Sequence, residues 1–326
     1  MHKKIVVLGT GGTIAGTAQS AADNVGYRAA QLSIESLLKA VPGLNAALGT
    51  LALESEQIMQ LDSKDVGPAH WRALAKQAHA HLTRSDVVGL VVTHGTDTLE
   101  ESAFFLSQVL PASLLGHKPV VLTGAMRPAT ALAPDGPQNL RDAVAVCCDK
   151  NARGVLVAFA GAAHAAQYVQ KTHPYRLAAF DSGEAGPLGL VEEGAVRWLH
   201  PCPHLDMESA PFPLERLQQL HWPRVDIVLS HACANGAIVR ALTRAPLPGD
   251  EAVSGIVVAG TGNGTIHQDL EDALLAAQMQ GVRVVRSSRC SLGTIVQGLN
   301  PRAGIARSAA PTPIKARIAL MLDLMR

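Results

Sequence analysis

The sequence lacks the charge excess and the long apolar runs that mark nucleic-acid-binding and membrane-spanning proteins. Its formal net charge is only +1, and no run of like charges stands out. A nucleic-acid-binding protein usually carries a basic patch, so a small neutral or zwitterionic substrate fits the charge better. No stretch is long enough to span a membrane. The first apolar run stops at Leu8 and enters a glycine-rich loop, which predicts a strand rather than a signal peptide.

Cysteines and aromatic residues are also few. The five cysteines (Cys147, Cys148, Cys202, Cys233 and Cys290) are an odd, irregularly spaced set. Such a set does not suit a disulfide framework, and it favours a reducing compartment, the cytoplasm. Aromatic residues make up 3% of the chain and hydrophobic residues 48%. The core must therefore be built mainly from alanine, valine, leucine and isoleucine.

Short apolar runs alternate with helical patterns over residues 1–199. The runs are rich in valine and bounded by Gly, Asp or Pro, as buried strands are. Alternation of strands and helices indicates βαβ units and a parallel sheet. Strands are expected at 5–8, 87–93, 120–122 and 155–159, and helices at 68–82, 99–110 and 138–149.

Residues 200–223 interrupt this alternation with five prolines and predict a linker. Beyond it, strands are expected at 225–229, 255–258 and 282–285, and helices at 267–280 and 314–325. The predicted fold class is α/β. It comprises a larger N-terminal catalytic domain, 1–199, with a mostly parallel sheet flanked by helices, and a smaller C-terminal α/β domain, 224–326.

The loop after the first strand, 9–16, has the sequence GTGGTIAG. In open α/β sheets, ligands bind beyond the carboxyl ends of strands, and glycines let the backbone approach a ligand closely. A dinucleotide-binding fingerprint would need glycine where Ile14 stands. Thr13 is the only side chain in the centre of the loop able to act as a nucleophile. On this loop alone, a threonine hydroxyl that caps local backbone is the simpler interpretation.

The loop after the strand at 87–93 has the sequence HGTDTLEE. Thr98 and Glu101 match a capping box at the start of a helix. Thr96 and Asp97 precede that cap and are not explained by it. A carboxylate at Asp97 could bind a substrate ammonium or stabilise the helix N-terminus, and the residues alone leave both interpretations open.

Other catalytic classes find little support. The histidine-rich segment His200-x-Cys202-x-His204 resembles a metal-ligand cluster, but prolines interleave it and no second cluster completes a site. His79 and His81 are expected on a polar helix face, so no metal site is predicted. The chain also has neither a Gly-x-Ser-x-Gly elbow nor a P-loop.

Two long segments, VVLGTGGTIAG and VVTHGTDTLEESAFFL, resemble the two signature motifs of bacterial-type L-asparaginases, the asparaginase/glutaminase family. VLTGAMRP (121–128), DGPQNLRDAV (135–144), AGTGNGT (259–265) and VVRSSR (284–289) are similar to further family segments. The resemblance covers essentially the whole chain. It implies hydrolysis of the side-chain amide of asparagine, often with some glutamine activity, to the acid and ammonia, without metal or cofactor.

The resemblance also implies catalytic residues. Thr13 corresponds to the nucleophile of the first motif, and Tyr27 to the tyrosine of a mobile lid, here 15–31. Thr96 and Asp97 correspond to the catalytic pair of the second motif, and Lys171 completes their hydrogen-bonded triad.

Implied substrate contacts come from both domains. Ser63 resembles the serine that holds the α-carboxylate, and Ala125 the position whose carbonyl contacts the amide. The backbone around Gly12 and Gly95 is expected to contact the substrate together with Thr96 and Asp97, since N–H groups of such loops can form an oxyanion hole. Asn263 and Thr265 are expected to reach the site of a neighbouring subunit, in a homotetramer built as a dimer of dimers.

The chain departs from the family pattern at three places. Lys64 stands where the family has glutamine or a small polar residue. Ala160-Gly161 replaces an Asn-Asp pair upstream of Lys171. A carboxylate contributed by the neighbouring subunit is missing, because no Asp or Glu occurs between Asp272 and Asp323.

Three other functions are compatible with the sequence. A glutaminase-leaning member of the family would use the same residues. An amidotransferase subunit that releases ammonia for tRNA amidation usually carries an extra N-terminal domain, whereas this sequence starts at its first strand. A catalytically weak amino-acid sensor would bind without turnover, although all five catalytic candidates are present.

Overall fold

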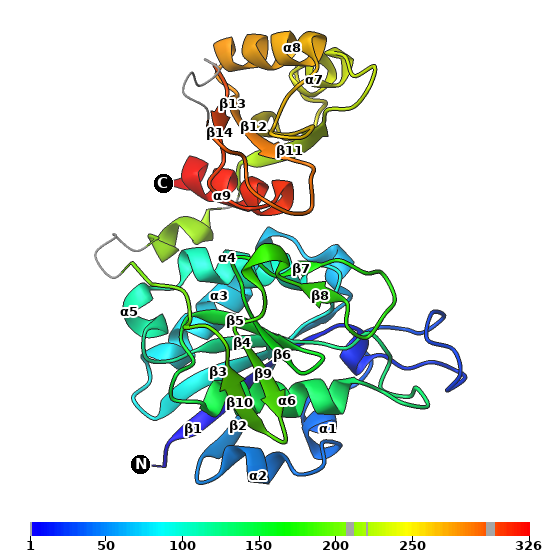
Figure 1. The fold of residues 1–326 in the computed structure, drawn as a ribbon, viewed down its shortest axis with the longest axis vertical. Coiled ribbons are helices and arrows are strands. Elements are labelled where there is room, and N and C mark those ends of the chain that lie inside the picture. The colour runs from blue at the N-terminus through cyan, green and yellow to red at the C-terminus, as the bar shows by residue number, and fades with distance from the viewer. Residues whose placement is uncertain (1, 207–211, 220, 298–303) are drawn as a thin grey trace. The chain divides into compact units, whose positions relative to one another are not determined.

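The computed structural model describes residues 2–206, 212–219, 221–297 and 304–326. The chain forms two units, Met1–Leu214 and Glu215–Arg326. Each unit has its own main sheet with helices packed on it (Figure 1). The expected linker, 200–223, includes residues 207–211 and 220, which lie outside the described part. Every described helix is too short or too polar to cross a bilayer.

Unit 1 is built on an eight-stranded sheet with the order β10-β9-β6-β5-β4-β3-β1-β2. The strands from β5 to β2 in that order run parallel, whereas β6, β9 and β10 pair antiparallel. The bounds are β1 (Lys4–Gly11), β2 (Ala52–Leu61), β3 (Val87–Thr93), β4 (Val120–Thr123), β5 (Val155–Phe159), β6 (Ala162–Ala165), β9 (Gly189–Glu192) and β10 (Ala195–Trp198). A separate hairpin pairs β7 (Gln170–Lys171) with β8 (Phe180–Asp181).

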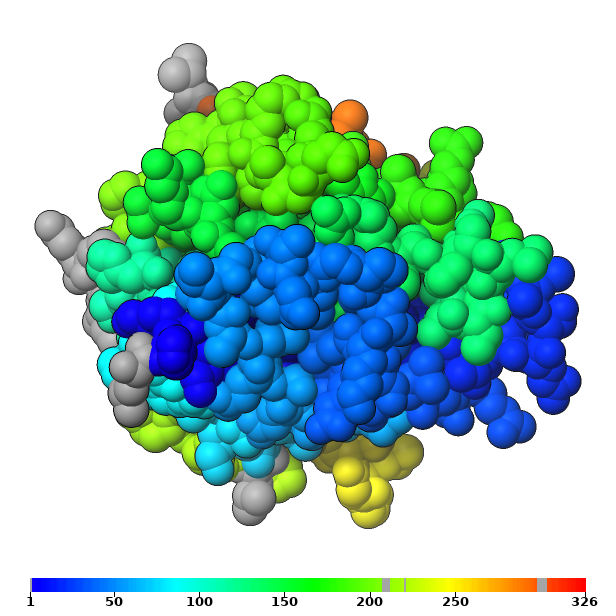
Figure 2. Space-filling view, turned by 90° about the horizontal axis from the view of Figure 1, so that it is seen from below, coloured from blue at the N-terminus to red at the C-terminus, as the bar shows by residue number. Residues whose placement is uncertain are grey.

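Helices cover both faces of this sheet. One face carries α3 (Pro68–Thr83) and α4 (Leu99–Val109), and the other carries α1 (Ile34–Lys39), α2 (Leu44–Leu48) and α6 (Gly136–Cys148) (Figure 1). Figure 2 looks onto the second face, where the blue residues of α1 and α2 cover much of the surface. One buried hydrophobic cluster joins this layer to the sheet, and its members include Ile34 and Leu140 from the helices and Ile5 and Val91 from the strands. Burial on both faces explains why the central strands are continuous apolar runs.

Unit 2 has a four-stranded parallel sheet with the order β11-β12-β13-β14. Helix α9 packs on one face, and α7 and α8 lie on the other (Figure 1). The bounds are β11 (Arg224–Leu229), β12 (Val253–Gly260), β13 (Arg283–Ser288), β14 (Ala306–Arg307), α7 (Ala237–Leu242), α8 (Gln268–Met279) and α9 (Pro313–Met325).

The predicted fold class is confirmed: a larger, mostly parallel sheet precedes a smaller parallel one, and every predicted strand and helix is present. The predicted polar face of α3 is wrong at His81. His81 is only 8% exposed, and its Nε2 lies 2.7 Å from Oε2 of Glu56. Glu56 belongs to β2, a strand that the sequence did not reveal, and β2 supplies the partner that lets an imidazole be buried there.

Candidate active site

Four neighbouring parallel strands end at one edge of the unit 1 sheet. Their order is β4-β3-β1-β2, so the segments that follow them meet at this edge. These segments are 124–127, 94–98, 12–16 and 62–65. All but one of the candidate residues predicted in the N-terminal domain lie in them or in the lid. Lys171 arrives separately, on β7.

The two glycine loops touch backbone to backbone. A Cβ placed on Gly12 would lie 2.4 Å from both Cα and N of Gly95. Gly12 also has φ +80°, in the left-handed region that glycine tolerates best. Any side chain at Gly12 would push the loops apart. Thr13 and Thr96 each follow one of these glycines, so the contact brings both threonines to the same place.

Thr13 is buried and bonded to the lid. It begins a short 3-10 helix, η1 (Thr13–Ala15), and is 6% exposed. Its Oγ1 lies 2.6 Å from the hydroxyl of Tyr27, and either group can donate the hydrogen bond. Burial raises the pKa of Tyr27, so this phenol is neutral near pH 7.

The lid returns on itself and is tied to a second loop. Thr17 and Arg28 pair in both directions through their backbones. Ala18 N donates to Oγ1 of Thr130 at 2.9 Å, and Leu132 N donates to Ala21 O at 3.0 Å. Figures 1 and 2 both show the blue lid projecting beside the green loop around residue 130. These hydrogen bonds fix the lid in the conformation that places Tyr27 against Thr13.

Thr96 belongs to a polar triad. The Nζ of Lys171 donates to Thr96 Oγ1 at 2.9 Å and to Asp97 Oδ1 at 2.6 Å. Thr96 is 4% exposed, whereas the side chain of Asp97 is 57% exposed. A buried hydroxyl therefore shares its ammonium partner with a carboxylate that faces solvent. The exposed carboxylate is accessible to a cationic group of a ligand.

Glu100 was missed by sequence reasoning. It is 7% exposed, and its Oε2 accepts a hydrogen bond from the backbone N–H of Lys171. Glu100 thereby fixes the strand that carries the lysine. The sequence feature that could have identified Glu100 is a carboxylate on the buried side of α4, near Ser102 and Ala103. A buried acid needs a polar partner, which suggests a specific role.

Ser63 lies against the second motif. It starts the 3-10 helix η2 (Ser63–Asp65) after β2 and is 3% exposed. A Cβ on Gly95 would come within 2.5 Å of Ser63 Oγ. The next residue, Lys64, is 60% exposed, and its Nζ lies 2.5 Å from Asp65 Oδ2 and 3.8 Å from Asp62 Oδ2. The charge of Lys64 is therefore shared with two adjacent carboxylates.

The predicted capping box at Thr98 is wrong. Thr98 occupies the N-cap position of α4, but its side chain makes no capping hydrogen bond. Its Oγ1 instead donates to the carbonyl of Ser63 at 2.8 Å. The competing acceptor lies on a segment 35 residues away in sequence. Thr98 therefore joins the two segments that carry Ser63 and Thr96.

A buried hydrogen-bond chain supports Gly95 from behind. Trp71 Nε1 donates to Ser102 Oγ at 2.9 Å, which lies 2.9 Å from Nε2 of His94. The Nδ1 of His94 lies 2.8 Å from Gly95 O. A carbonyl only accepts, so Nδ1 carries the proton, and Nε2 accepts from Ser102. Burial lowers the pKa of His94, which agrees with this neutral form.

Ala125 lies in the loop after β4 and is fully buried. A Cβ on the preceding Gly124 would come 2.4 Å from His94 O and 3.4 Å from Cγ2 of Thr96. The loop 124–127 therefore packs directly on the second motif.

Asn263 and Thr265 lie in unit 2, after β12, and their hydrogen bonds stay within that unit. The amide of Asn263 both donates to and accepts from the backbone of Val296, at 2.9 and 2.7 Å. Thr265 Oγ1 lies 2.7 Å from Thr261 Oγ1. Residues 298–303, which cover the place of the missing carboxylate, lie outside the described part.

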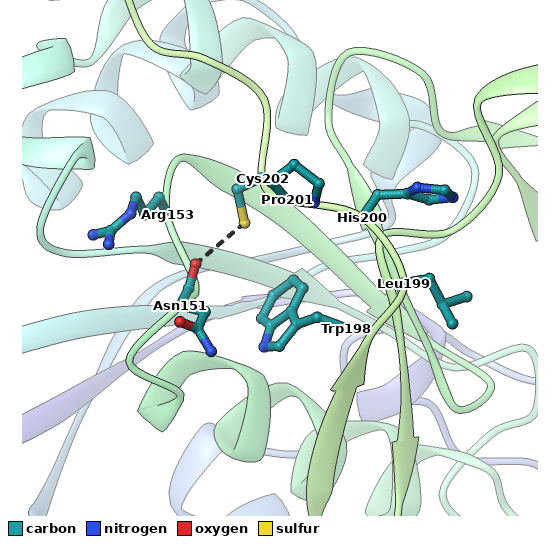
Figure 3. A pocket seen from close by; sticks show the side chains of 7 residues that line it. All are labelled: Asn151, Arg153, Trp198, Leu199, His200, Pro201 and Cys202. Carbon is teal, nitrogen blue, oxygen red and sulfur yellow. Dashed lines mark hydrogen bonds between the residues drawn. The ribbon is translucent and has the colours of Figure 1, made fainter.

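Residues 200–202 of the histidine- and cysteine-containing segment 200–204 line a hollow of about 420 Å³ beside Trp198. Cys202 Sγ donates to Asn151 O at 3.5 Å, and His200 points away from it (Figure 3). Among the described residues, no group of three His, Cys, Asp or Glu is placed to hold a metal ion. This hollow contains none of the candidate catalytic residues.

The arrangement suits attack on a carbonyl carbon. Two buried threonine hydroxyls lie in touching loops, one paired with a neutral phenol and the other with an ammonium. A hydroxyl becomes a useful nucleophile when a neighbour accepts its proton. Serine and aspartate side chains at the same edge offer contacts for the carboxylate and the ammonium of an amino acid.

Family models match both units. The model described as "Asparaginase, N-terminal" matches residues 4–203, and that described as "Glutaminase/Asparaginase C-terminal domain" matches residues 224–326.

Individual proteins match over nearly the whole chain. L-asparaginase 2 of Escherichia coli is 36% identical over 325 residues, which cover 98% of this chain and 88% of the relative. A glutaminase-asparaginase of Pseudomonas fluorescens is 37% identical over 295 residues, or 90% of this chain and 77% of the relative. The crystal structure of a probable cytoplasmic L-asparaginase from Campylobacter jejuni matches with a TM-score of 0.87 at 36% identity, covering 99% of this chain and 95% of that one.

Proposed function

The chain belongs to the asparaginase/glutaminase family, and on this premise we propose that it hydrolyses L-asparagine to L-aspartate and ammonia through a threonine nucleophile. The observation that carries the proposal is the meeting of two buried threonines at one edge of the sheet, each bonded to a proton-carrying side chain. The reaction needs a nucleophile, a route for its proton and donors for the developing oxyanion. Each of these has a candidate at this edge.

Thr13 Oγ1 bonds to the side-chain carbonyl carbon, and its proton passes to the Tyr27 hydroxyl, 2.6 Å away. As it accepts that proton, the neutral phenol passes its own proton on towards the amide nitrogen, which thereby becomes able to leave as ammonia. Backbone N–H groups around Gly12 and Gly95 stabilise the oxyanion. Ammonia leaves from the tetrahedral intermediate, and water then releases aspartate from the acyl-enzyme. Donors aimed at an oxyanion commonly contribute about a hundredfold to a thousandfold in rate.

Thr96, Asp97 and Lys171 form the second half of the machinery. Asp97 binds the α-ammonium of the substrate, and Ser63 binds the α-carboxylate. Lys171 orients Thr96 through the 2.9 Å hydrogen bond and holds Asp97 in place. The carbonyl of Ala125 accepts a hydrogen bond from the amide nitrogen.

Assembly and location belong to the same proposal. Asn263 and Thr265 reach the site of a second subunit in a homotetramer of paired dimers. A two-fold pair makes such a shared site twice. Five free cysteines and the Campylobacter neighbour named as cytoplasmic support a cytoplasmic location, whereas a Haemophilus influenzae relative, 38% identical, is named as probably periplasmic.

Glutamine is the second candidate substrate, because a 37% identical relative is named glutaminase-asparaginase. A silent amino-acid sensor is disfavoured by the presence of all five catalytic candidates. One experiment separates these functions: ammonia release measured with L-asparagine, with L-glutamine and with no substrate, each with and without EDTA. We expect release from asparagine that EDTA does not change. Binding without ammonia release would establish the sensor, and loss on chelation restored by zinc would overturn the metal-independent mechanism.

A further inference from the structure

The loop that carries Ala125 is held by the first turn of α6. Asp135 occupies the N-cap position of this helix but makes no capping hydrogen bond. Its carboxylate accepts instead from two backbone N–H groups of the loop, Met126 at 2.9 Å and Arg127 at 3.0 Å. Aspartate is a residue type that often caps its own helix. Asp135 instead binds two backbone N–H groups that lie nine and eight residues earlier in the sequence.

These bonds decide where the Ala125 carbonyl points. No described peptide bond is cis, and in a trans peptide the C=O of one residue and the N–H of the next point in opposite directions. Because Met126 N–H points at Asp135, the Ala125 C=O points away from Asp135. Ala125 is fully buried, and no described residue donates a hydrogen bond to its carbonyl. Buried carbonyls are normally paired, so this one is suited to a donor brought by a ligand.

Asn139 fixes the other side of Ala125. It lies one turn into α6 and is 2% exposed. Its Nδ2 donates to Gly124 O at 3.0 Å and to Asp135 Oδ2 at 3.1 Å, and its Oδ1 accepts from Ala160 N at 3.0 Å. Both amide protons and the amide oxygen are thus used. Asn139 joins the loop after β4 to the end of β5 and also holds the Asp135 carboxylate.

The same turn touches the first motif. A Cβ on Gly136 would come 2.8 Å from Cγ1 of Ile14 and 3.5 Å from the Cβ of Ala125. Ile14 directly follows the candidate nucleophile, Thr13. The start of α6 is therefore in contact with the loop of the nucleophile and with the loop of the acceptor carbonyl.

We propose that Asp135 and Asn139 are positioning residues that aim the Ala125 carbonyl at the nitrogen of the scissile amide. This inference rests on the proposed function, in which that nitrogen must be held while its bond to carbon breaks. Asp135 sets the direction of the Ala125 carbonyl by binding the N–H of Met126. Asn139 fixes the position of the preceding peptide by donating to the carbonyl of Gly124. Neither side chain touches the substrate.

The test compares two substrates that differ only at the leaving group. L-Asparagine presents an N–H to the Ala125 carbonyl, and the β-methyl ester of L-aspartate presents none. For Asp135→Ala we expect kcat/KM on asparagine to fall between about tenfold and about a hundredfold, the effect of losing hydrogen bonds to a charged group. The ester should stay within about threefold. Asp135→Asn keeps one acceptor oxygen for two N–H donors, so its loss should be intermediate.

Asp142→Asn is the matched control. Asp142 lies on the same helix, is 2% exposed, and its Oδ1 accepts from Gln138 Nε2 at 2.7 Å, away from the loop. It should change neither substrate by more than about twofold. The inhibition constant of L-aspartate, which has no amide N–H, should also be unchanged in Asp135→Ala, and this readout needs no ester turnover.

An equal loss on both substrates in a folded Asp135→Ala protein, or a weakened inhibition by L-aspartate, would overturn the inference while leaving the proposed function intact. An equal loss in Asp142→Asn would do the same. A wild-type protein that cleaves neither substrate would overturn the proposed function itself.

Discussion

Replacing Tyr27 with phenylalanine separates two roles that the 2.6 Å contact with Thr13 allows. The substitution removes one oxygen and keeps the ring. That ring packs against the lid, since a Cβ on Gly16 would lie 2.9 Å from Tyr27 Cδ2. Tyr27→Phe should therefore leave the lid packed and remove only the hydrogen-bonding group.

The two roles differ in magnitude. If the tyrosine hydroxyl only orients Thr13, its loss removes one neutral hydrogen bond, about 0.5–1.5 kcal/mol, or roughly a twofold to thirteenfold fall in kcat. If it takes part in proton transfer, the loss is about a hundredfold to ten-thousandfold. We expect the second range, because the phenol is neutral and is the side chain bonded to the Thr13 hydroxyl.

The assay is steady-state ammonia release from asparagine, with thermal unfolding followed in parallel. Tyr175→Phe serves as the control, since Tyr175 is 59% exposed in the loop after Lys171. The double variant Thr13→Ala/Tyr27→Phe should be no slower than Thr13→Ala alone, because residues that act as a unit are not additive. A Tyr27→Phe enzyme that keeps more than about a tenth of the wild-type kcat would refute the proton-transfer role.

The other predictions concern the remaining site and one ion-pair network. Thr13→Ala and Thr96→Val should each nearly abolish turnover in a folded protein, and a Thr13→Ala enzyme that loses only about 1.4 kcal/mol, a tenfold fall in kcat, would not have lost its nucleophile. Asp97→Asn should raise KM for asparagine and lower kcat, and unchanged kinetics would mark Asp97 as a helix-start residue only. Hydrogen bonds from Arg84 lower the pKa of Glu54 to about 2, so this pair stabilises the fold above the ordinary carboxyl pKa and loses that contribution as the pH falls towards about 2. In urea titrations, Glu54→Gln should reduce the acid-induced loss of unfolding free energy by no more than about 1 kcal/mol, since the pair is partly exposed. An unchanged pH dependence of the unfolding free energy would show that other carboxylates cause this loss.

The central strands could be predicted because each is buried on both faces and therefore continuously apolar. The edge strand β2 could not, since its sequence ALESEQIMQL places charged groups on a half-exposed edge. The short antiparallel strands β6, β9 and β10 have four residues each, too few to show a period. Periodicity thus finds the elements that hold the site, but not the sheet margins.

The candidate site shows the same limit at the level of side chains. Thr13 and Thr96 stand in glycine loops whose sequence alone points to the edge of a sheet. The spacing of Thr98 and Glu101 predicts a local cap, because local spacing does not reveal an acceptor on another segment, here the Ser63 carbonyl. Glu100 and Asn139 were given no role for the same reason: their partners, Lys171 and Gly124, are brought near only by the tertiary fold.

The strand order of unit 1 has a consequence for synthesis on the ribosome. From β3 to β6, each new strand pairs beside the one made before it, so the sheet can be extended in the order in which the chain emerges. The loop that carries Thr13 follows the first strand, yet Lys171 lies 75 residues after its partner Thr96. At about 5–20 residues per second, that interval corresponds to roughly 4–15 s of translation. A nascent chain therefore carries both threonines for seconds without the lysine, and it cannot act as an enzyme before the β7–β8 hairpin has been made.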